Sequence, residues 1–213
     1  MRIVKDADER RNEILDAADA LFAQKGFDRT SISDILNKVG VARGLIYYYF
    51  KSKEEIMDAL IERINTRILS AANEIALKKN IPVFERLFKT LTAMVYIDNT
   101  DHITDHMHQP QNALMHQKSH KALLKGIPPI LLGIIEDGIE EKVFNTPYPY
   151  ESIEMVIAHL NTVLDGEYMN DLSPAERLGR IKAFIFNLER IFGAKPGSFS
   201  PVLRLFDLGR EIG

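Results

Sequence analysis

An arginine and three consecutive tyrosines stand together between residues 43 and 49. The planar guanidinium of Arg43 can donate two hydrogen bonds to the O6 and N7 atoms of guanine. An α-helix turns by about 100° per residue, so Tyr47, Tyr48 and Tyr49 cannot all face a core. At least one phenol should be exposed, where its hydroxyl can donate to phosphate and its ring can pack on sugar or on a thymine methyl group. The segment therefore favours contact with DNA.

Lys53 adds a cation a few residues downstream. Residues 52–55 (SKEE) have the capping-box pattern that starts a helix. The backbone N–H groups and the dipole at a helix start favour an anion, and an ammonium group adds to that attraction. Lys53 is therefore expected to contact phosphate. The alternative is that the tyrosines brace their own helix and that Lys53 is solvated.

These side chains need a scaffold, and the first fifty residues provide one. Apolar residues recur at helical spacing over 7–25, 31–39 and 43–50. The run from Ser31 to Asp34 resembles a capping box in which Asp replaces Glu, and Gly40 is suited to the turn. The pattern predicts a helix-turn-helix whose second helix exposes the tyrosines. The residues expected to face inward are Ile14, Ala18, Leu21, Phe22, Ile32, Ile35, Leu36, Val39, Ile46 and Phe50.

Helical periodicity continues through the rest of the chain, and no segment has the alternating pattern of a strand. A long connector helix is predicted over 52–78, whereas residues 99–121 are polar, rich in histidine and interrupted by Pro110. The prolines at 128 and 129 are expected to begin a helix, and residues 144–150 to form a loop. Further helices are expected over 83–97, 151–166 and 174–192.

The start at residue 174 is the clearest of these. Residues 173–176 (SPAE) combine a serine N-cap, a proline at the first helical position and a glutamate at the third. The sequence as a whole predicts an all-α fold of about nine helices. Residues 1–51 would form the helix-turn-helix head, and residues 52–213 would form a bundle-like body.

Composition narrows the class of protein. Apolar residues make up 46% and charged residues 27% of the 213 positions, which is typical of a soluble globular chain. Cysteine is absent from the sequence, so disulfides and thiolate metal sites are excluded. The N-terminus carries charges where a signal peptide needs an apolar core, and the longest apolar run, at 127–135, is too short to span a membrane. A cytoplasmic protein without a membrane partner is expected.

Charge is distributed unevenly along the chain, although the net charge is only −3. Residues 1–53 hold ten basic and eight acidic side chains, and residues 54–213 hold seventeen and twenty-two. A basic head on an acidic body fits contact with phosphate at one end, although chance produces imbalances of this size equally well. The distribution argues against a nucleoid-type DNA binder, which gains affinity from broad positive charge.

Residues 10–60 resemble the N-terminal signature of the TetR (tetracycline repressor) family of transcriptional regulators. The similarity lies in LFAQKGF at 21–27, TSISDI at 30–35, GVARGLIYYYF at 40–50 and SKEEI at 52–56. It is specific because the turn, the recognition helix and the start of the connector agree in spacing. Beyond residue 60 the body carries no such motif.

The resemblance implies a homodimer that binds a palindromic operator in double-stranded DNA and that an unidentified small-molecule effector releases. The effector would shift the connector helix and so change the spacing of the two recognition helices. Neither enzymatic activity nor a cofactor is expected. Carried over by position, the DNA-contacting residues are Thr30, Ser31, Ser33, Arg43, Gly44, Leu45, Tyr47, Tyr49 and Lys53.

Two positions depart from the family pattern. Ala42 stands where a serine often caps the recognition helix, so that cap must come from elsewhere or be weaker, at a cost of about 1 kcal/mol. Leu45 stands where threonine is common. Its side chain cannot donate to phosphate, so contact with a thymine methyl group is the role it can offer.

Family members dimerise through their last two large helices, which match 151–166 and 174–192. Apolar residues of the second helix spread over an arc too wide for one internal face, although burial within one chain gives the same pattern. The expected interface residues are Ile153, Ile157, Leu160, Ile181, Phe184, Ile185 and Leu188.

The effector pocket is expected within 60–170, although helical methionine is more often core. Its candidate lining residues are Met94, Tyr96, Met107, Met115, Tyr168 and Met169.

Five of the six histidines lie between residues 102 and 120. His102 and His106, like His116 and His120, are four residues apart, which places two imidazoles on one helix face as possible metal ligands. A metal-responsive regulator or a helical metalloenzyme is the alternative function that this cluster suggests. A solvated polar segment explains the cluster more simply, because no third ligand is fixed by spacing and no common hydrolase motif is present.

Overall fold

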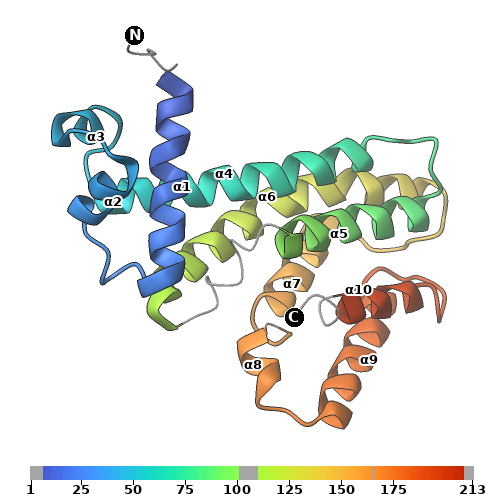
Figure 1. Cartoon of the computed structure of the whole chain (residues 1–213). Helices are drawn as coiled ribbons and strands as arrows, with labels where there is room; N and C mark the ends of the chain where they lie inside the picture. Colours follow the sequence, from blue (N-terminus) through green and yellow to red (C-terminus); the bar gives the residue numbers. More distant parts are fainter. Residues whose placement is uncertain (1–6, 101–109, 165, 209–213) are drawn as a thin grey trace. The chain divides into compact units, whose positions relative to one another are not determined.

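The computed structural model describes residues 7–100, 110–164 and 166–208. Within these ranges the chain forms ten α-helices, two short 3-10 helices and no strand (Figure 1), which confirms the predicted all-α class. The α-helices are α1 (Ala7–Lys25), α2 (Ile32–Val39), α3 (Arg43–Tyr49), α4 (Lys53–Ala76), α5 (Val83–Thr100), α6 (Ala113–Glu140), α7 (Pro149–Leu160), α8 (Gly166–Asn170), α9 (Pro174–Ile191) and α10 (Leu203–Leu208). The 3-10 helices are η1 (Pro110–Asn112) and η2 (Ser200–Val202).

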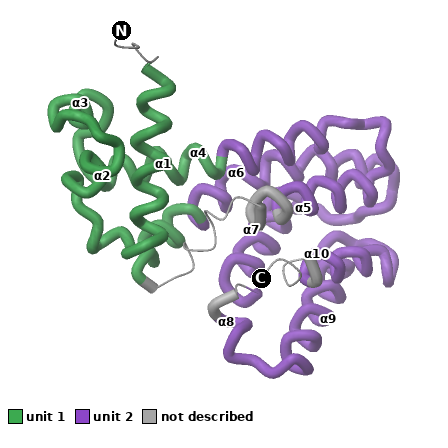
Figure 2. The backbone as a smooth tube through the Cα atoms, in the orientation of Figure 1, with its two compact units in different colours: residues 1–65, 102–119 green, residues 66–101, 120–213 purple. Residues whose placement is uncertain are grey.

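The chain divides into two compact units, coloured separately in Figure 2. The first unit comprises residues 1–65 and 102–119, and the second comprises residues 66–101 and 120–213. The helices α4 and α6 each contribute residues to both units. The boundary expected after residue 51 lies just before the start of α4 at Lys53, whereas the first unit extends along that helix to Asn65.

The first unit is held together by apolar side chains that α1 to α4 bury jointly. Phe22, Ile35, Ile46 and Ile56, one from each of these helices, are fully buried. The Phe22 ring packs edge-to-face against Phe27, with centroids 5.2 Å apart. The inward face of α3 is therefore fixed by Ile46, as its helical spacing predicted.

The turn between α1 and α2 is locked by η1. The backbone N–H of Phe27 donates to Asn112 Oδ1 at 2.9 Å, and Asn112 Nδ2 donates to the carbonyl of Phe22 at 3.3 Å. Gly26 takes a left-handed φ of 83°, and a Cβ there would lie 2.7 Å from the Gln111 side chain. Only glycine satisfies both the backbone angle and the close approach at this turn.

The sequence prediction was wrong about where α6 begins. The helix starts at Ala113 and continues through Pro128 and Pro129, which were expected to begin it. Burial explains the difference, because Met115 and Ile127 lie on the preceding turns and are already in the core. Tertiary packing keeps the helix continuous through two residues that cannot donate to the helical ladder.

Helix α9 begins where it was predicted, whereas α8 was not predicted and α7 differs from the prediction at both ends, beginning at Pro149 within the expected loop. The expected helix over 151–166 ends earlier, at Leu160, because Asn161 caps it through its backbone N–H, which donates to the carbonyl of Ile157 at 2.9 Å. The predicted start of α9 is confirmed as a complete capping box between Ser173 and Glu176. The side-chain hydrogen bond from Ser173 lowers the pKa of Glu176 below its ordinary value.

Aromatic rings and one buried ion pair hold the second unit. Phe84 and Phe144 have ring centroids 5.1 Å apart, and Phe199 lies 5.9 Å from Phe144. Arg86 on α5 is only 2% exposed and pairs with Asp137 on α6 at 2.6 Å. A buried guanidinium needs such a partner, because an isolated charge in a core is costly.

No helix within the described ranges combines the length and the apolar character needed to cross a lipid bilayer.

Candidate nucleic-acid interface and effector cavity

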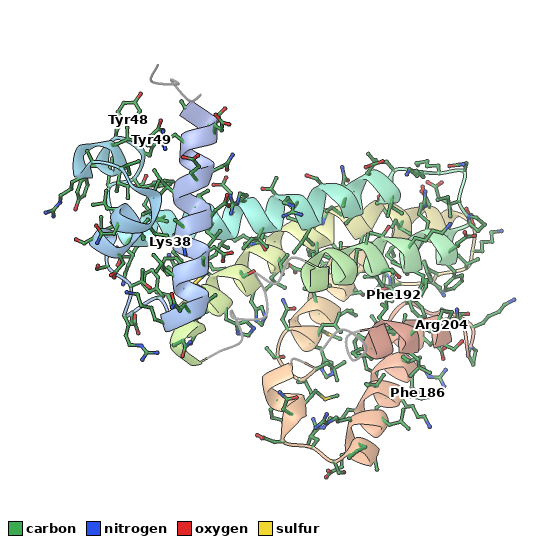
Figure 3. The ribbon with its side chains drawn as sticks, viewed as in Figure 1. Lys38, Tyr48, Tyr49, Phe186, Phe192 and Arg204 are labelled. Atoms are coloured by element: carbon green, nitrogen blue, oxygen red, sulfur yellow. The ribbon has the colours of Figure 1, made fainter. Side chains whose placement is uncertain are left out.

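The helix α3 lies at the surface of the first unit with its polar face outward. Ile46 is fully buried and Phe50, just past the end of the helix, is 2% exposed. Tyr47 and Tyr48 are 45% and 78% exposed, and the side chain of Tyr48 projects away from the unit in Figure 3. A seven-residue rod anchored from one side has the dimensions of an element that enters the major groove.

Aromatic contacts support the exposed side chains of α3. The Arg43 guanidinium lies over the Tyr47 ring at 5.7 Å from its centroid, and Tyr48 packs edge-to-face with Tyr49 at 5.0 Å. Within the described chain Arg43 has no carboxylate partner. Its five donors therefore remain available for an acceptor outside the chain, such as a guanine edge or a phosphate.

The start of α3 shows the weaker cap that Ala42 predicts. Ala42 is the N-cap residue, and no side chain accepts a hydrogen bond from the first backbone N–H groups. A Cβ on Gly44 would have open space around it, so the backbone of α3 is accessible at this position. Leu45 is half-buried, which leaves part of its side chain for apolar contact.

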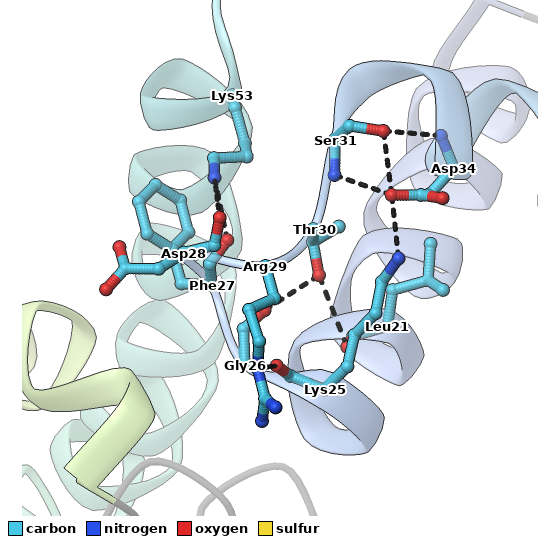
Figure 4. A network of polar contacts seen from close by, with 10 residues as sticks. All are labelled: Leu21, Lys25, Gly26, Phe27, Asp28, Arg29, Thr30, Ser31, Asp34 and Lys53. Atoms are coloured by element: carbon cyan, nitrogen blue, oxygen red, sulfur yellow. Dashed lines mark hydrogen bonds and ion pairs between the residues drawn. The ribbon is translucent and has the colours of Figure 1, made fainter.

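The start of α2 is a tight polar network (Figure 4). Ser31 caps α2 and donates from its hydroxyl to Asp34 Oδ2 at 2.7 Å, and the same carboxylate oxygen lies 2.7 Å from Lys25 Nζ. The hydrogen bond from Lys25 and those from Ser31 hold the pKa of Asp34 far below its ordinary value. Ser31 is therefore exposed but engaged in capping, whereas Ser33 is exposed on the first turn of α2.

Thr30 differs from the other predicted contact residues. Its side chain is 2% exposed, and its hydroxyl donates to the carbonyls of Gly26 at 2.8 Å and of Leu21 at 3.4 Å (Figure 4). The hydroxyl thus closes the turn between α1 and α2 from the inside. In this conformation it has no surface to offer to a phosphate.

Lys53 is also engaged within the unit. Its Nζ donates to the carbonyl of Phe27 at 2.7 Å and lies 3.4 Å from that of Asp28, and the Phe27 ring centroid is 4.1 Å away. The ammonium group has three donors, so one remains beyond these two carbonyls. Lys53 therefore ties the start of α4 to the turn before α2, and any phosphate contact must share the same group.

Only one of the two hydrogen bonds of the predicted capping box forms at the start of α4. The backbone N–H of Glu55 donates to Ser52 Oγ at 3.1 Å, as expected. The Glu55 carboxylate instead accepts from the backbone N–H of Lys51 at 2.6 Å, one residue before the expected partner. The carboxylate still satisfies a backbone donor at the helix start, so the helix begins where it was predicted.

Tyr48 is the exposed residue that the sequence prediction left out of the contact set. It is the most exposed aromatic side chain on α3. A signal for it was present, because Ile46 and Phe50 define the inner face and residue 48 falls opposite to them at about 100° per residue.

The second unit contains an apolar cavity of about 280 Å³. Residues of α5, α6, α7, α9, η2 and α10 line it, among them Leu131, Ile157 and Phe184. All described lining residues are apolar except Asn161. The volume is close to the lower end of small-molecule pockets, which are about 300–1,000 Å³ and mostly apolar. The cavity is therefore suited to a small apolar ligand.

Of the six residues predicted to line a pocket, Met94 lines this cavity. Met115 is fully buried in the first unit, Met169 is buried away from the lining, and Tyr168 is 52% exposed. The side chain of Tyr96 and the whole of Met107 lie outside the described part of the chain. Methionine and tyrosine content was thus a poor guide, because aliphatic and phenylalanine side chains make up most of the wall.

Two stretches of the sequence match known family profiles. Residues 14–60 match "Bacterial regulatory proteins, tetR family", and residues 95–173 match "Tetracyclin repressor-like, C-terminal domain". The fatty acid metabolism regulator protein of Bacillus subtilis (strain 168) is 30% identical over 131 residues, which cover 60% of this chain and 67% of that protein. The chain belongs to the TetR family.

Other relatives place this TetR-family chain among transcriptional regulators. The regulator TtgR of Pseudomonas putida is 38% identical over 64 residues, which are 30% of each chain. SmeT, the repressor of the Stenotrophomonas maltophilia multidrug efflux pump SmeDEF, shares the fold with a TM-score of 0.66 and 20% identity, over 90% of this chain and 93% of SmeT. FadR of Bacillus halodurans gives a TM-score of 0.62 and 23% identity, over 84% and 94% of the two chains.

TetR-family proteins are ligand-responsive DNA-binding transcriptional regulators, and this chain is such a regulator rather than an enzyme. The comparisons give no support to the metal-responsive or metalloenzyme alternative. His102 and His106 lie outside the described residues. Within the part that is described, no group of three or more histidine and acidic side chains is placed to hold a metal ion.

The seven residues expected at the dimer interface of this TetR-family protein are buried or half-buried within the single chain. Six are at most 8% exposed, and Leu160 is half-buried. Ile153, Ile157, Leu160, Phe184 and Leu188 line the cavity. Phe184 and Leu188 of α9 thus contact a cavity within the chain. The exposed apolar side chains of α7 and α9 are others, namely Met155, Leu178 and Phe186.

Proposed function

We propose that this chain is a homodimeric repressor that binds a palindromic operator through α3 and leaves it when an apolar effector enters the cavity of the second unit. The observation that carries the proposal is the outward face of α3, where Arg43 has no carboxylate partner within the described chain and two tyrosines are exposed. Such a face has no internal role, so its side chains are free for an external one.

The side chains of α3 divide into two groups by the contact they can make. Arg43 can pair with a guanine edge and so carries sequence information, while Leu45 offers apolar contact to a thymine methyl group. Tyr47 and Tyr48 can donate hydroxyl hydrogen bonds to phosphates, which fix position rather than sequence. Ser33, exposed at the start of α2, belongs with the phosphate contacts. Thr30 is not part of this proposed interface, because its hydroxyl is buried.

A second copy of the chain completes the proposed operator-binding protein. One such head makes a small interface, and two heads on half-sites about 34–36 Å apart multiply specificity. We place the contact between copies on α7 and α9, because Met155, Leu178 and Phe186 are 59%, 47% and 53% exposed there. Exposed large apolar side chains on these two helices are suited to such an interface.

The effector acts through its different affinities for the DNA-bound and released states. A ligand changes an equilibrium only by that difference, which is typically about 1–3 kcal/mol, or about 5- to 150-fold in affinity. The cavity is lined by residues of α5, α6, α7, α9, η2 and α10. A ligand in the cavity therefore contacts α6, a helix that also contributes residues to the first unit.

Footprinting on the DNA upstream of the protein's own gene tests the DNA-binding part of the proposal. The wild type should protect two half-sites about 10 base pairs apart centre to centre, or a multiple of that spacing. Arg43→Ala should weaken specific binding about tenfold or more, since a bidentate base contact provides about 1–3 kcal/mol of discrimination. Lys195→Ala, which removes one positive charge from the second unit, is the matched control. Equal loss in both variants, or none in Arg43→Ala, would contradict the assignment of α3.

Sedimentation equilibrium tests the second copy. Phe186→Asp should shift the protein toward monomer and reduce operator affinity, because a carboxylate would be buried in an apolar interface. Leu77→Asp changes a side chain that is 70% exposed outside α7 and α9, and it should leave the dimer intact. A dimer that survives Phe186→Asp would rule out this face.

A further inference from the structure

The side chains that line the cavity in the second unit are almost all apolar, and this restricts the kind of ligand that can bind there. Eighteen residues line it, and within the described chain none of them carries a charge. Seventeen are aliphatic, aromatic or thioether side chains, and the remaining one is Asn161. A carboxylate or an ammonium group placed in this wall would lose water without gaining a counter-charge.

Asn161 is half-buried and is the polar residue among those that line the cavity. The residue follows the last turn of α7, and its backbone N–H is bonded to that turn. The next residues hold the same turn, because the N–H groups of Val163 and Leu164 both donate to the carbonyl of His159. The backbone of Asn161 is thus fixed, whereas its side-chain oxygen and nitrogen have no hydrogen-bond partner within the described chain.

A half-buried amide without a protein partner in an apolar wall can pair with one polar group of a ligand. The amide offers an acceptor oxygen and a donor nitrogen, so it can pair with a hydroxyl, a carbonyl or an N–H of a ligand. Ligand pockets typically combine an apolar lining with a few polar groups of this kind that fix orientation. The amide itself is neutral, so it gives a charged group no compensation equal to a salt bridge.

We propose that the effector is an uncharged, largely apolar molecule with one hydrogen-bonding group, and that this group pairs with the side-chain amide of Asn161. The proposal rests on the proposed function, in which this cavity is the effector site. It adds the charge of the ligand and the residue that selects it.

Displacement of a fluorescent probe tests the charge rule on the full-length protein. N-phenylnaphthylamine is neutral and apolar, and its fluorescence rises on entering an apolar site. Decanol, decanoate and decylamine share one chain length but are neutral, anionic and cationic at pH 7. Decanol should displace the probe at a concentration about tenfold lower than either charged compound, because a charge without a partner is costly in this wall. Decanoate or decylamine displacing as well as decanol would overturn the proposal.

Substitution of Asn161 tests the residue. Asn161→Leu should weaken decanol about fivefold, as expected for one hydrogen bond, while the binding of naphthalene, which has no polar group, stays unchanged. Asn161→Asp should make decylamine displace the probe at a lower concentration than decanoate, because it supplies a carboxylate. Asn187→Leu on the exposed face of α9 is the matched control and should alter none of these values. Unchanged decanol affinity in Asn161→Leu would overturn the role of Asn161.

The same experiment separates this inference from the proposed function. If the probe binds wild type but Leu131→Trp, which fills the cavity, does not reduce its binding, then the cavity is not the effector site and both proposals fail. If Leu131→Trp blocks the probe while the charge order or the Asn161→Leu effect is absent, the cavity remains and the ligand class is wrong. Circular dichroism of each variant verifies that the helical fold is retained.

Discussion

The Nζ atom of Lys53 lies 2.7 Å from the carbonyl oxygen of Phe27 and 4.1 Å from the centroid of its ring. One side chain thus contacts both the backbone and the π-face of a residue 26 positions earlier. The contact joins the first residue of α4 to the turn that precedes α2, and so links the connector helix to the helix-turn-helix.

The Lys53 contact should contribute measurably to stability. Lys53→Met keeps the length of the side chain but removes the donor and the cation, so we expect a loss of about 1–2 kcal/mol in urea unfolding. Lys51→Met changes an exposed lysine two residues earlier and should cost little. Equal stability of Lys53→Met and wild type would mean that the contact adds nothing.

The unfilled cap of α3 offers a stabilising substitution. Ala42→Ser provides a hydroxyl that can accept from a free backbone N–H, and we expect a gain of about 0.5–1 kcal/mol in thermal unfolding. Ser31→Ala removes the corresponding cap of α2 and should lower stability by about 1 kcal/mol. A loss of stability in Ala42→Ser would show that the hydroxyl cannot reach the N–H groups of α3.

Thr30 and Ser33 should respond oppositely to loss of their hydroxyls. Thr30→Val removes buried hydrogen bonds and should destabilise the protein by about 1–2 kcal/mol, while the folded fraction keeps its operator affinity. Ser33→Ala should leave stability unchanged and weaken operator binding about threefold. Urea unfolding and fluorescence anisotropy with labelled operator measure the two effects. Weaker DNA binding by fully folded Thr30→Val would restore it to the contact set.

Asp137 balances the buried charge of Arg86. Asp137→Asn should destabilise the protein by about 3 kcal/mol, because Arg86 would remain 2% exposed without a counter-charge. Lys79 also pairs with Asp137 at 2.9 Å, but its side chain is 76% exposed, so Lys79→Met should cost at most about 0.5 kcal/mol. Similar losses in the two variants would show that burial of Arg86 is not the deciding factor.

The carboxylate of Asp137 should also make the free energy of unfolding decrease as the pH falls. The hydrogen bond from Lys79, followed by that from Arg86, lowers the pKa of Asp137 below its ordinary 3.8. A carboxylate with a lowered pKa stabilises the fold above its unfolded pKa and loses that contribution as the pH falls toward the folded one. Unfolding free energies at pH 7, 4 and 3 should therefore decline less steeply below pH 4 in Asp137→Asn than in wild type. Parallel declines would contradict the assignment.

The helix-turn-helix was predictable because local signals decide it. Capping residues, a turn glycine and apolar spacing all act within a few residues, and α2, α3 and the start of α4 begin within one residue of where they were expected. Thr30 was not predictable in this way, because the sequence does not say that its hydroxyl turns inward to Gly26. Tyr48 could have been placed by the helical angle alone.

The body was harder to predict because its features depend on distant partners. The apolar arc of α9 fits both an interface between copies and the wall of a cavity, and the sequence does not show that α5, α6 and α7 line that cavity with it. Pro128 and Pro129 look like a helix start, yet burial on both sides keeps α6 continuous. Asn161 showed no local sign of lining a cavity.

The two prolines within α6 leave the carbonyls of Leu124 and Lys125 without the helical donors that residues 128 and 129 would otherwise provide. The ladder of peptide hydrogen bonds is therefore interrupted for two consecutive steps. Local unfolding that begins at one end of α6 should stop at this gap. In hydrogen–deuterium exchange, the amides before Pro128 and those after Pro129 should therefore exchange as separate cooperative segments. The helix α6, which is continuous in Figure 1, should then open as two shorter helices placed end to end.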